Sequence, residues 1–198
     1  LNNQRIVDSN EMDKMQGSYL GPKFSSDEIK KYLDSVNAKY ENICEEKKLV
    51  NIVSDALVNQ KVVGWHYDRM EFGPRSLGHR SILGDPRSQN MQSIMNLKIK
   101  YRESFRPFAP SVLSEKANEW FDINVKSPYM LLVAPIKKSK QIEMNAEQKQ
   151  LFGIDKLNIS RSEIPAVTHV DYSARIQTVH KETNSRYHKL ISEFEDAT

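Results

Sequence analysis

Cysteine, glycine and long apolar runs are all scarce in this sequence of 198 residues. Cys44 is the only cysteine, which excludes an internal disulfide framework and a multi-cysteine zinc site. The longest apolar run, Tyr129–Ile136, has eight residues, whereas a membrane-spanning helix needs about 20. The chain does not open with the basic and then apolar residues of a secretory leader. We therefore expect a cytoplasmic protein without a membrane span.

Two common nucleotide-binding motifs are also absent. The sequence contains neither the phosphate-binding loop GxxxxGK[ST] nor the dinucleotide-binding pattern GxGxxG. Any nucleotide site in this chain must therefore be of a less common type.

The net charge of +3 comes from the middle of the chain. Residues 61–110 carry 9 basic and 4 acidic residues, a net +5, whereas residues 1–60 carry 8 and 10 and residues 111–198 carry 12 of each. Most of the central cations are arginines among glycines, prolines and aromatics: Arg69, Arg75, Arg80, Arg87, Arg102 and Arg106. Because the guanidinium group matches the oxygens of phosphate and carboxylate, this pattern favours a partly buried anion site.

The glycines of this region, Gly73, Gly78 and Gly84, would let backbone N–H groups approach such an anion. An alternative interpretation is that the arginines pair with nearby acidic side chains and only hold loops together. The candidate acids are Glu71, Asp85 and Glu103. Composition alone leaves both readings open.

Hydrophobic periodicity predicts an α/β chain in which helices and strands interleave. Ser25 and Glu28 form a capping-box pattern before the first predicted helix. Helices are expected over 27–35, 44–59, 89–100, 115–121 and 183–195. Strands are expected over 61–67, 111–113, 129–136, 166–170 and 175–180, of which 61–67 and 129–136 are predicted to be buried. Residues 68–88 are predicted to be rich in loops, and 137–163 to be a polar insertion with a weak helix near 145–152.

Three blocks, in order along the chain, strongly resemble one family. They are EFGPRSLGHRSILGDPR at 71–87, KIKYRESFRPFAPSVL at 98–113 and IPAVTHVDYSARIQTVH at 164–180. Together they resemble the C-terminal domain of the nodulation-type and antibiotic-tailoring O-carbamoyltransferases, over about 18–198. The resemblance implies a YrdC-like α/β fold, with a twisted, largely open mixed sheet and flanking helices.

The resemblance also implies a two-part enzyme. In this family an N-terminal metal-containing domain transfers a carbamoyl group to an acceptor hydroxyl. The C-terminal domain forms carbamoyl adenylate from carbamoyl phosphate and ATP, with Mg²⁺. This chain matches only the C-terminal domain, so no metal ligand is assigned in it. A homodimer is compatible with the family.

On this basis the chain divides into three parts. Residues 1–20 are interpreted as a linker or the tail of the N-terminal domain, and 21–60 as a helical junction. Residues 61–198 are interpreted as the carbamoyltransferase domain. Since the family's closing Asn-Thr-Ser-Phe-Asn block is absent, we expect this domain to be truncated.

The same resemblance assigns roles to individual residues. Lys100 and Arg106 are the expected catalytic residues, and Lys100 with Arg102 matches the Lys-x-Arg signature of the YrdC-like fold. Substrate or nucleotide binding is expected of Arg75, Arg102, Arg175 and His169. For His169 the alternative is a hydrogen-bonded histidine on a strand. Asp68 and Tyr172 depart from the family's pattern, because glycine is usual at both positions.

Two functions of other classes stay open. Tyr101, Phe105 and Phe108 alternate with cations, as in grooves that bind single-stranded nucleic acid. The basic excess is compact, however, and does not form a long electrostatic track, which disfavours nucleic acid as a partner. The other alternative is a catalytically silent module that only docks the N-terminal domain. The presence of five cations in the matching positions disfavours it.

Overall fold

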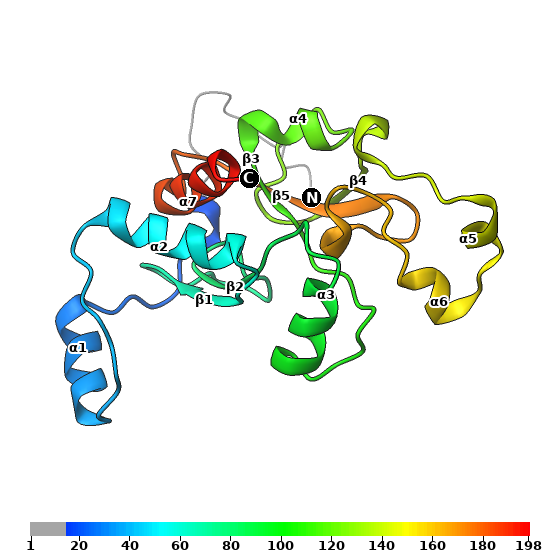
Figure 1. Ribbon diagram of the computed structural model, residues 1–198. Coiled ribbons are helices and arrows are strands. Elements are labelled where there is room, and N and C mark those ends of the chain that lie inside the picture. Colours follow the sequence, from blue (N-terminus) through cyan, green and yellow to red (C-terminus); the bar gives the residue numbers. More distant parts are fainter. Residues whose placement is uncertain (1–14) are drawn as a thin grey trace, which may run out of the picture.

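The computed structural model describes residues 15–198, so most of the predicted linker lies outside the described residues. Strands β1 (Val63–His66) and β2 (Arg80–Leu83) form an antiparallel pair. A second sheet has the order β3-β5-β4, in which β3 (Ser111–Leu113) runs parallel to β5 (Ser173–Val179) and β4 (Leu132–Pro135) runs antiparallel to it (Figure 1). Helices flank both sheets. The predicted α/β class with a small, open, mixed sheet is confirmed.

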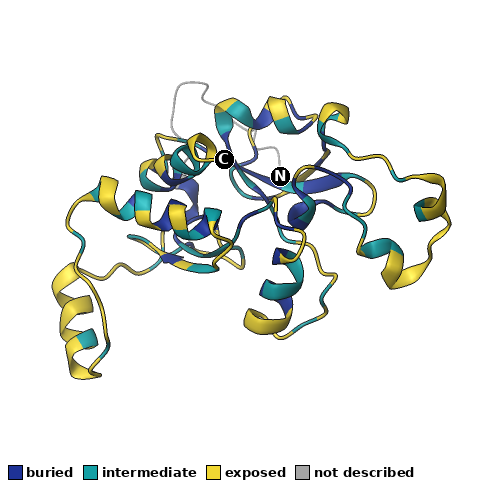
Figure 2. Cartoon of the chain, in the orientation of Figure 1, coloured by how far each residue is buried: buried dark blue, intermediate teal, exposed yellow. Residues whose placement is uncertain are grey.

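The helices begin and end close to the predicted residues in most cases. They are α1 (Ser26–Ser35), α2 (Glu46–Val58), α3 (Met91–Ile94), α4 (Ala117–Trp120), α5 (Ala146–Gln150), α6 (Gly153–Leu157) and α7 (Ser185–Asp196). The Ser25 side chain caps α1 by accepting from the Glu28 N–H at 3.3 Å, and the Glu28 carboxylate accepts from the Ser25 N–H at 2.8 Å. Helix α1 buries none of its residues and extends away from the body of the molecule (Figure 2).

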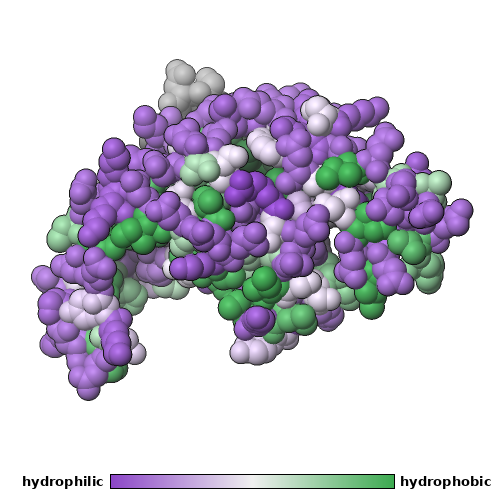
Figure 3. Space-filling view, viewed as in Figure 1, coloured by the Kyte–Doolittle hydropathy of each residue, from purple (hydrophilic) through white to green (hydrophobic). Residues whose placement is uncertain are grey.

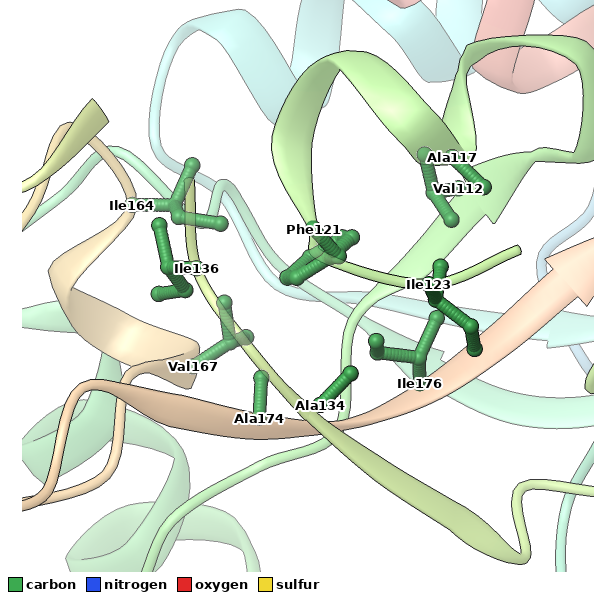
Figure 4. Packing of buried hydrophobic residues seen from close by; sticks show 10 residues of the cluster. All are labelled: Val112, Ala117, Phe121, Ile123, Ala134, Ile136, Ile164, Val167, Ala174 and Ile176. Atoms are coloured by element: carbon green, nitrogen blue, oxygen red, sulfur yellow. The ribbon is translucent and has the colours of Figure 1, made fainter. Parts of the chain in front are cut away.

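The main hydrophobic core packs against one face of strand β5, and a cavity lies against the other face. Because side chains alternate along a strand, Ala174 and Ile176 share one face, and both are fully buried. They pack beneath α4 in a cluster of ten residues (Figure 4): Val112, Ala117, Phe121, Ile123, Ala134, Ile136, Ile164, Val167, Ala174 and Ile176. Arg175 and Gln177 lie on the other face of the strand, where they line a cavity.

A second core joins α2 and α7 to β1. Its buried members are Val50, Val53, Leu57, Trp65, Val179, Tyr187 and Leu190. The indole N–H of Trp65 donates to the Gly78 carbonyl oxygen at 2.9 Å, which ties this core to the loop between β1 and β2. In the described part of the chain, no helix is long and apolar enough to cross a membrane.

Residues 18–22 lie along residues 70–72. The Phe72 N–H donates to the Ser18 carbonyl at 2.7 Å, and the Gly21 N–H donates to the Met70 carbonyl at 2.9 Å. The Tyr19 ring stacks on the His79 ring with 3.7 Å between centroids. This short segment therefore covers one side of the glycine-containing loop.

Several predictions of local structure are wrong. Residues 68–88 are rich in loops, as predicted, but they also contain the unpredicted strand β2, which forms by pairing with β1. The predicted strand over 166–170 is instead a 3₁₀ turn at Pro165–Val167. It is closed by the Thr168 hydroxyl, which donates to the Ile164 carbonyl at 2.7 Å. Helix α6 was not predicted.

The two strands predicted to be buried are only partly so. In β1 just Trp65 is buried. In β4 just Ala134 is buried, because β4 lies at the edge of its sheet and its other face opens onto the cavity side. The long apolar run at 129–136 therefore reflects an edge strand with one covered face.

Candidate anion-binding site

A cavity of about 700 Å³ lies between the three-stranded sheet, the loop before β2, the segment after α3 and helix α7. All six residues singled out from the sequence line it: Arg75, Lys100, Arg102, Arg106, His169 and Arg175. They come from three segments that are distant in the chain. The fold therefore brings together the cations of all three sequence blocks.

The remaining central arginines hold loops together, as the alternative reading proposed. The Arg80 side chain pairs with the Glu71 carboxylate at 3.1 Å, and Arg87 pairs with Asp85 at 2.8 Å. Arg69 donates to the Gly21 carbonyl at 3.1 Å. Arg106 also lies 3.8 Å from Glu103, so each of the three candidate acids pairs with an arginine. Arg75, Arg102 and Arg106 line the cavity, and their role as anion ligands stays a prediction.

The cations of the cavity are poorly neutralised. Within residues 15–198, the side chains of Arg75, Lys100 and Arg175 form no hydrogen bond or ion pair. Arg106 has only an exposed contact with Glu103 at 3.8 Å. No aspartate or glutamate of the described chain lines the cavity. The cavity therefore holds a concentration of positive charge that protein groups do not balance.

The charges of Arg175 and Arg75 oppose one another. Burial, and then the positive charge of Arg75, lower the pKa of Arg175 below its usual value. Like charges in a partly buried site raise the free energy of the folded state unless an anion lies between them. This electrostatic conflict suits a site whose natural occupant is a polyanion.

The loop that carries Arg75 is organised around the buried carboxylate of Glu71. Its Oε1 accepts from the N–H groups of Leu77, at 2.5 Å, and His79, at 2.9 Å. Burial alone would raise the pKa of Glu71, but these backbone donors outweigh it and the pKa is lowered. Sequence reasoning had placed Glu71 only as a partner for arginines, and its role as the centre of the loop depends on the fold.

Gly78 is needed in this loop because a side chain would not fit there, and not because a ligand approaches its backbone. Its φ of +103° is a conformation that side-chain-bearing residues rarely adopt, and a Cβ there would collide with the ring of Tyr187. Its N–H donates to the Ser81 hydroxyl at 2.9 Å. The N–H of Gly78 itself is therefore taken by Ser81, and the expected approach of other backbone N–H groups to an anion stays a prediction.

Lys100, Arg102 and Arg106 follow a π-helical turn, Met95–Ile99, that continues α3. The Lys100 N–H donates to the Met95 carbonyl, five residues earlier, at 2.9 Å. Turns of this kind are rare and occur often at functional sites. Tyr101, with a positive φ of +49°, then reverses the backbone direction.

Asn96 holds this cationic segment in place. Its side chain is fully buried. Its Nδ2 donates to the carbonyl oxygens of Ser104, at 3.0 Å, and Arg106, at 2.8 Å, and its Oδ1 accepts from Arg102 Nε at 2.6 Å. The guanidinium of Arg102 also lies over the Phe108 ring, 4.8 Å from its centroid. Sequence reasoning missed Asn96, because nothing local shows that it is buried.

His169 precedes a tight turn that leads into β5. Its Nδ1 lies 3.1 Å from the Ser173 hydroxyl oxygen, and that hydroxyl donates to Asp171 Oδ1 at 2.6 Å. Burial lowers the pKa of His169. Tyr172 within the turn has a φ of +63°, and Asp68 has a φ of +51°. The left-handed backbone at these two positions explains why glycine suits them.

Two further lining residues were not identified from the sequence. Gln177 Nε2 donates to the Leu77 carbonyl at 2.7 Å, and its Oε1 accepts from the Ser111 hydroxyl at 2.9 Å. Tyr187 is fully enclosed, and burial raises its pKa to about 12. The alternation of Arg175 and Gln177 along β5 is a signal that could have identified Gln177.

Apolar side chains form the rest of the lining. Met91, Met95 and Phe108 lie on one side, and Leu190, Ile191 and Phe194 of α7 lie on another. Around α3 hydrophobic side chains also reach the surface (Figure 3), among them Leu97, Ile99 and Tyr101. A cavity lined by both cationic and apolar side chains can hold the phosphates of a ligand together with a flat, apolar ring.

The family model described as Carbamoyltransferase C-terminus matches residues 54–198. The chain belongs to this family. The matched region contains every residue that lines the cavity, from Leu57 to Phe194.

Relatives in several organisms support the assignment. An uncharacterized protein of Synechocystis sp. is 56% identical over 100% of this chain, which corresponds to 32% of that protein. Nodulation protein NolNO of Sinorhizobium fredii is 35% identical over 94% of this chain and 25% of its own length. The 3'-hydroxymethylcephem-O-carbamoyltransferase of Amycolatopsis lactamdurans is 35% identical over 72% of this chain and 23% of its own length. The chain thus spans no more than about a third of these relatives.

Proposed function

We propose that this carbamoyltransferase C-terminal domain binds carbamoyl phosphate and ATP in the cationic cavity and forms carbamoyl adenylate there. The observation that carries the proposal is the set of five cations that line one cavity, whose lining within residues 15–198 contains no aspartate or glutamate. Carbamoyl phosphate and ATP are both polyanions, so bringing them together requires such a surplus of positive charge.

The residues would act by position and charge. Arg75 and Arg175, whose charges repel in the free protein, would share one phosphoryl group between them. Lys100, Arg102 and Arg106 would hold a second one and offset the charge that builds up at the α-phosphate of ATP. Water would first cleave carbamoyl phosphate to carbamate and phosphate. A carbamate oxygen would then attack the α-phosphorus of ATP, and the bond from that phosphorus to pyrophosphate would break, so no side-chain nucleophile is needed. The overall products are carbamoyl adenylate, phosphate and pyrophosphate.

Mg²⁺, which normally accompanies ATP, finds no ligand set in this lining. Mg²⁺ prefers carboxylate, phosphate and water oxygens, and the described lining supplies no carboxylate. The lining residues therefore do not fit a resident Mg²⁺, and the ion would enter only as a complex with the phosphates of ATP. No step of the proposed reaction depends on a protein-bound metal.

A separate N-terminal part would then carry the carbamoyl group to an acceptor hydroxyl. The support is that the relatives are much longer than this chain and that one of them is named an O-carbamoyltransferase. The acceptor itself, a homodimer and a cytoplasmic location stay predictions.

Isothermal titration calorimetry with Mg-ATP, with and without carbamoyl phosphate, tests the proposal. We expect saturable one-to-one binding that Arg175→Gln and Arg75→Gln each weaken by about 1.5–3 kcal/mol, as for a lost charged hydrogen bond. Arg69→Gln is the matched control, because Arg69 lies in the same basic region but outside the cavity lining.

Two results would contradict the proposal, and each points to a different function. Absence of binding to both ligands would favour the silent docking module. Tighter binding of oligonucleotides, with an affinity that falls steeply as salt is raised, would favour the nucleic-acid reading. The exposed Tyr101 and Phe105 rings would then be the stacking surface.

A further inference from the structure

The cavity is rich in hydrogen-bond donors, and its side-chain acceptors are few: besides His169 and Gln177 they are the hydroxyl oxygens of Ser76, Ser81, Ser111 and Tyr187. Arginine and lysine side chains only donate. Acidic side chains are absent from the lining within residues 15–198, and the Gln177 carbonyl oxygen already accepts from Ser111. Phosphate oxygens suit this environment. The NH₂ group of a carbamoyl unit does not, because it only donates and needs an acceptor nearby.

The contacts of His169 make its second ring nitrogen an acceptor. Asp171, a carboxylate, can only accept, so the Ser173 hydroxyl must direct its proton to Asp171 Oδ1, at 2.6 Å. The Ser173 oxygen is then an acceptor for His169 Nδ1, at 3.1 Å, and Nδ1 must carry the proton of the neutral ring. Nε2 is left with a lone pair. It has no partner among the described residues.

The position of His169 fits this role. Its side chain lines the cavity and is half-buried, and Arg175 lines the same cavity from the start of β5. The His169 N–H donates to the Ser173 carbonyl at 2.8 Å, so the backbone of the turn also fixes where the ring sits. The lone pair at Nε2 and the Arg175 guanidinium group therefore belong to residues of the same cavity.

We propose that Nε2 of His169 accepts a hydrogen bond from the NH₂ group of the carbamoyl unit, and that Ser173 and Asp171 are positioning residues that fix the tautomer required. The inference rests on the proposed function and adds a rule for selectivity to it. Arg175 donates hydrogen bonds to phosphate oxygens, and His169 accepts one from the amino group. A lone pair at Nε2 is a poor partner for a phosphate oxygen, so His169 is not a phosphate ligand.

Acetyl phosphate is the probe for this inference. It has nearly the same shape and charge as carbamoyl phosphate, but a methyl group replaces the NH₂ group. We expect the protein to bind carbamoyl phosphate roughly 3- to 10-fold more tightly than acetyl phosphate, the range for one hydrogen bond. In His169→Ala this preference should fall to about 1-fold, while the affinity for acetyl phosphate stays unchanged. His66→Ala, a substitution at an exposed histidine outside the cavity, should keep the preference.

The tautomer gives a readout that needs no ligand. ¹⁵N NMR of the imidazole should show His169 protonated at Nδ1 in the unchanged protein. In Ser173→Ala the proton should move largely to Nε2, and the preference for carbamoyl phosphate should shrink. A purely structural role for Ser173 would leave the tautomer as it was.

The outcomes separate this inference from the proposed function. Equal affinities for carbamoyl and acetyl phosphate in the unchanged protein, with both reduced in Arg175→Gln, would overturn the role of His169 and keep the anion site. A His169 proton on Nε2 in the unchanged protein would also overturn it. If neither acyl phosphate nor inorganic phosphate binds, the proposed function fails, and this inference fails with it.

Discussion

Arg175 and Arg75 line the same cavity, and the lining within residues 15–198 includes no acidic side chain to separate their positive charges. The folded protein therefore carries an electrostatic cost that a bound anion would remove. Such an arrangement trades stability of the free protein for affinity.

The first prediction concerns the effect of anions on the stability of the folded protein. Adding phosphate or pyrophosphate should raise the melting temperature of the unchanged protein, because a ligand that binds only the folded state stabilises it. Arg175→Gln should melt at a higher temperature without anions and gain little when they are added. Differential scanning fluorimetry measures both effects. A melting temperature that rises equally in the two proteins would place the anion elsewhere.

The second prediction concerns Asn96. Replacing it with alanine removes two donors to backbone carbonyls and the acceptor for Arg102, so we expect a loss of about 2 kcal/mol in the free energy of unfolding. Anion affinity should fall as well, because Arg102 and Arg106 lose their support. Urea unfolding and calorimetry give the two values. Gln92→Ala is the control, since Gln92 makes a single contact to the same segment, with the Phe105 carbonyl at 2.8 Å.

The third prediction concerns pH and Glu71. The pKa of Glu71 in the folded state is lowered below its usual value, so its charged form stabilises the fold at pH values above the pKa of the unfolded chain. This contribution is lost as the pH falls through the lowered folded pKa. Glu71→Gln should cost about 2 kcal/mol at pH 7, and its stability should fall less steeply in acid than that of the unchanged protein. Unfolding curves between pH 3 and 7 test this (roughly the window where carboxylates titrate), and parallel acid slopes would argue against it.

The fourth prediction compares two glycines of one loop. Gly78→Ala should cost about 3 kcal/mol, because the new methyl group strains the backbone and collides with Tyr187. Gly73→Ala should cost about 1 kcal/mol, since its positive φ is strained but the space around it is open. Thermal or chemical unfolding of the pair suffices. Similar losses in both would show that packing on Tyr187 contributes little.

Sequence reasoning succeeded where the signal is local. The capping box at Ser25 and Glu28 lies within one turn, so the start of α1 could be predicted from four residues. It failed at β2, because Arg80–Leu83 becomes a strand only by pairing with β1 across a loop. It failed at 129–136 for a related reason, since an apolar run does not reveal which strand lies at the edge of a sheet.

Within the candidate site, too, some residues could be predicted from the sequence and others could not. Its cations could be predicted, because arginine and lysine in matched blocks are visible in the chain itself. Asn96 and Glu71 could not, because their importance comes from burial and from contacts with backbone groups that the sequence alone does not place beside them. Gln177 shares its face of β5 with Arg175, so the alternation along the strand could have identified it. Charged ligand contacts are therefore easier to find from sequence than the polar residues that support them.

The π-helical turn at Met95–Ile99 limits where residues can be inserted or deleted in this chain. A π-helical turn holds more residues than an α-helical turn, so deleting one residue from it would restore α-helical spacing and change the orientation of the following segment relative to α3. We expect Lys100 and Arg102 then to be displaced in the cavity although no cation had been replaced. Between Met91 and Lys100 the number of residues is thus constrained together with the identity of Asn96.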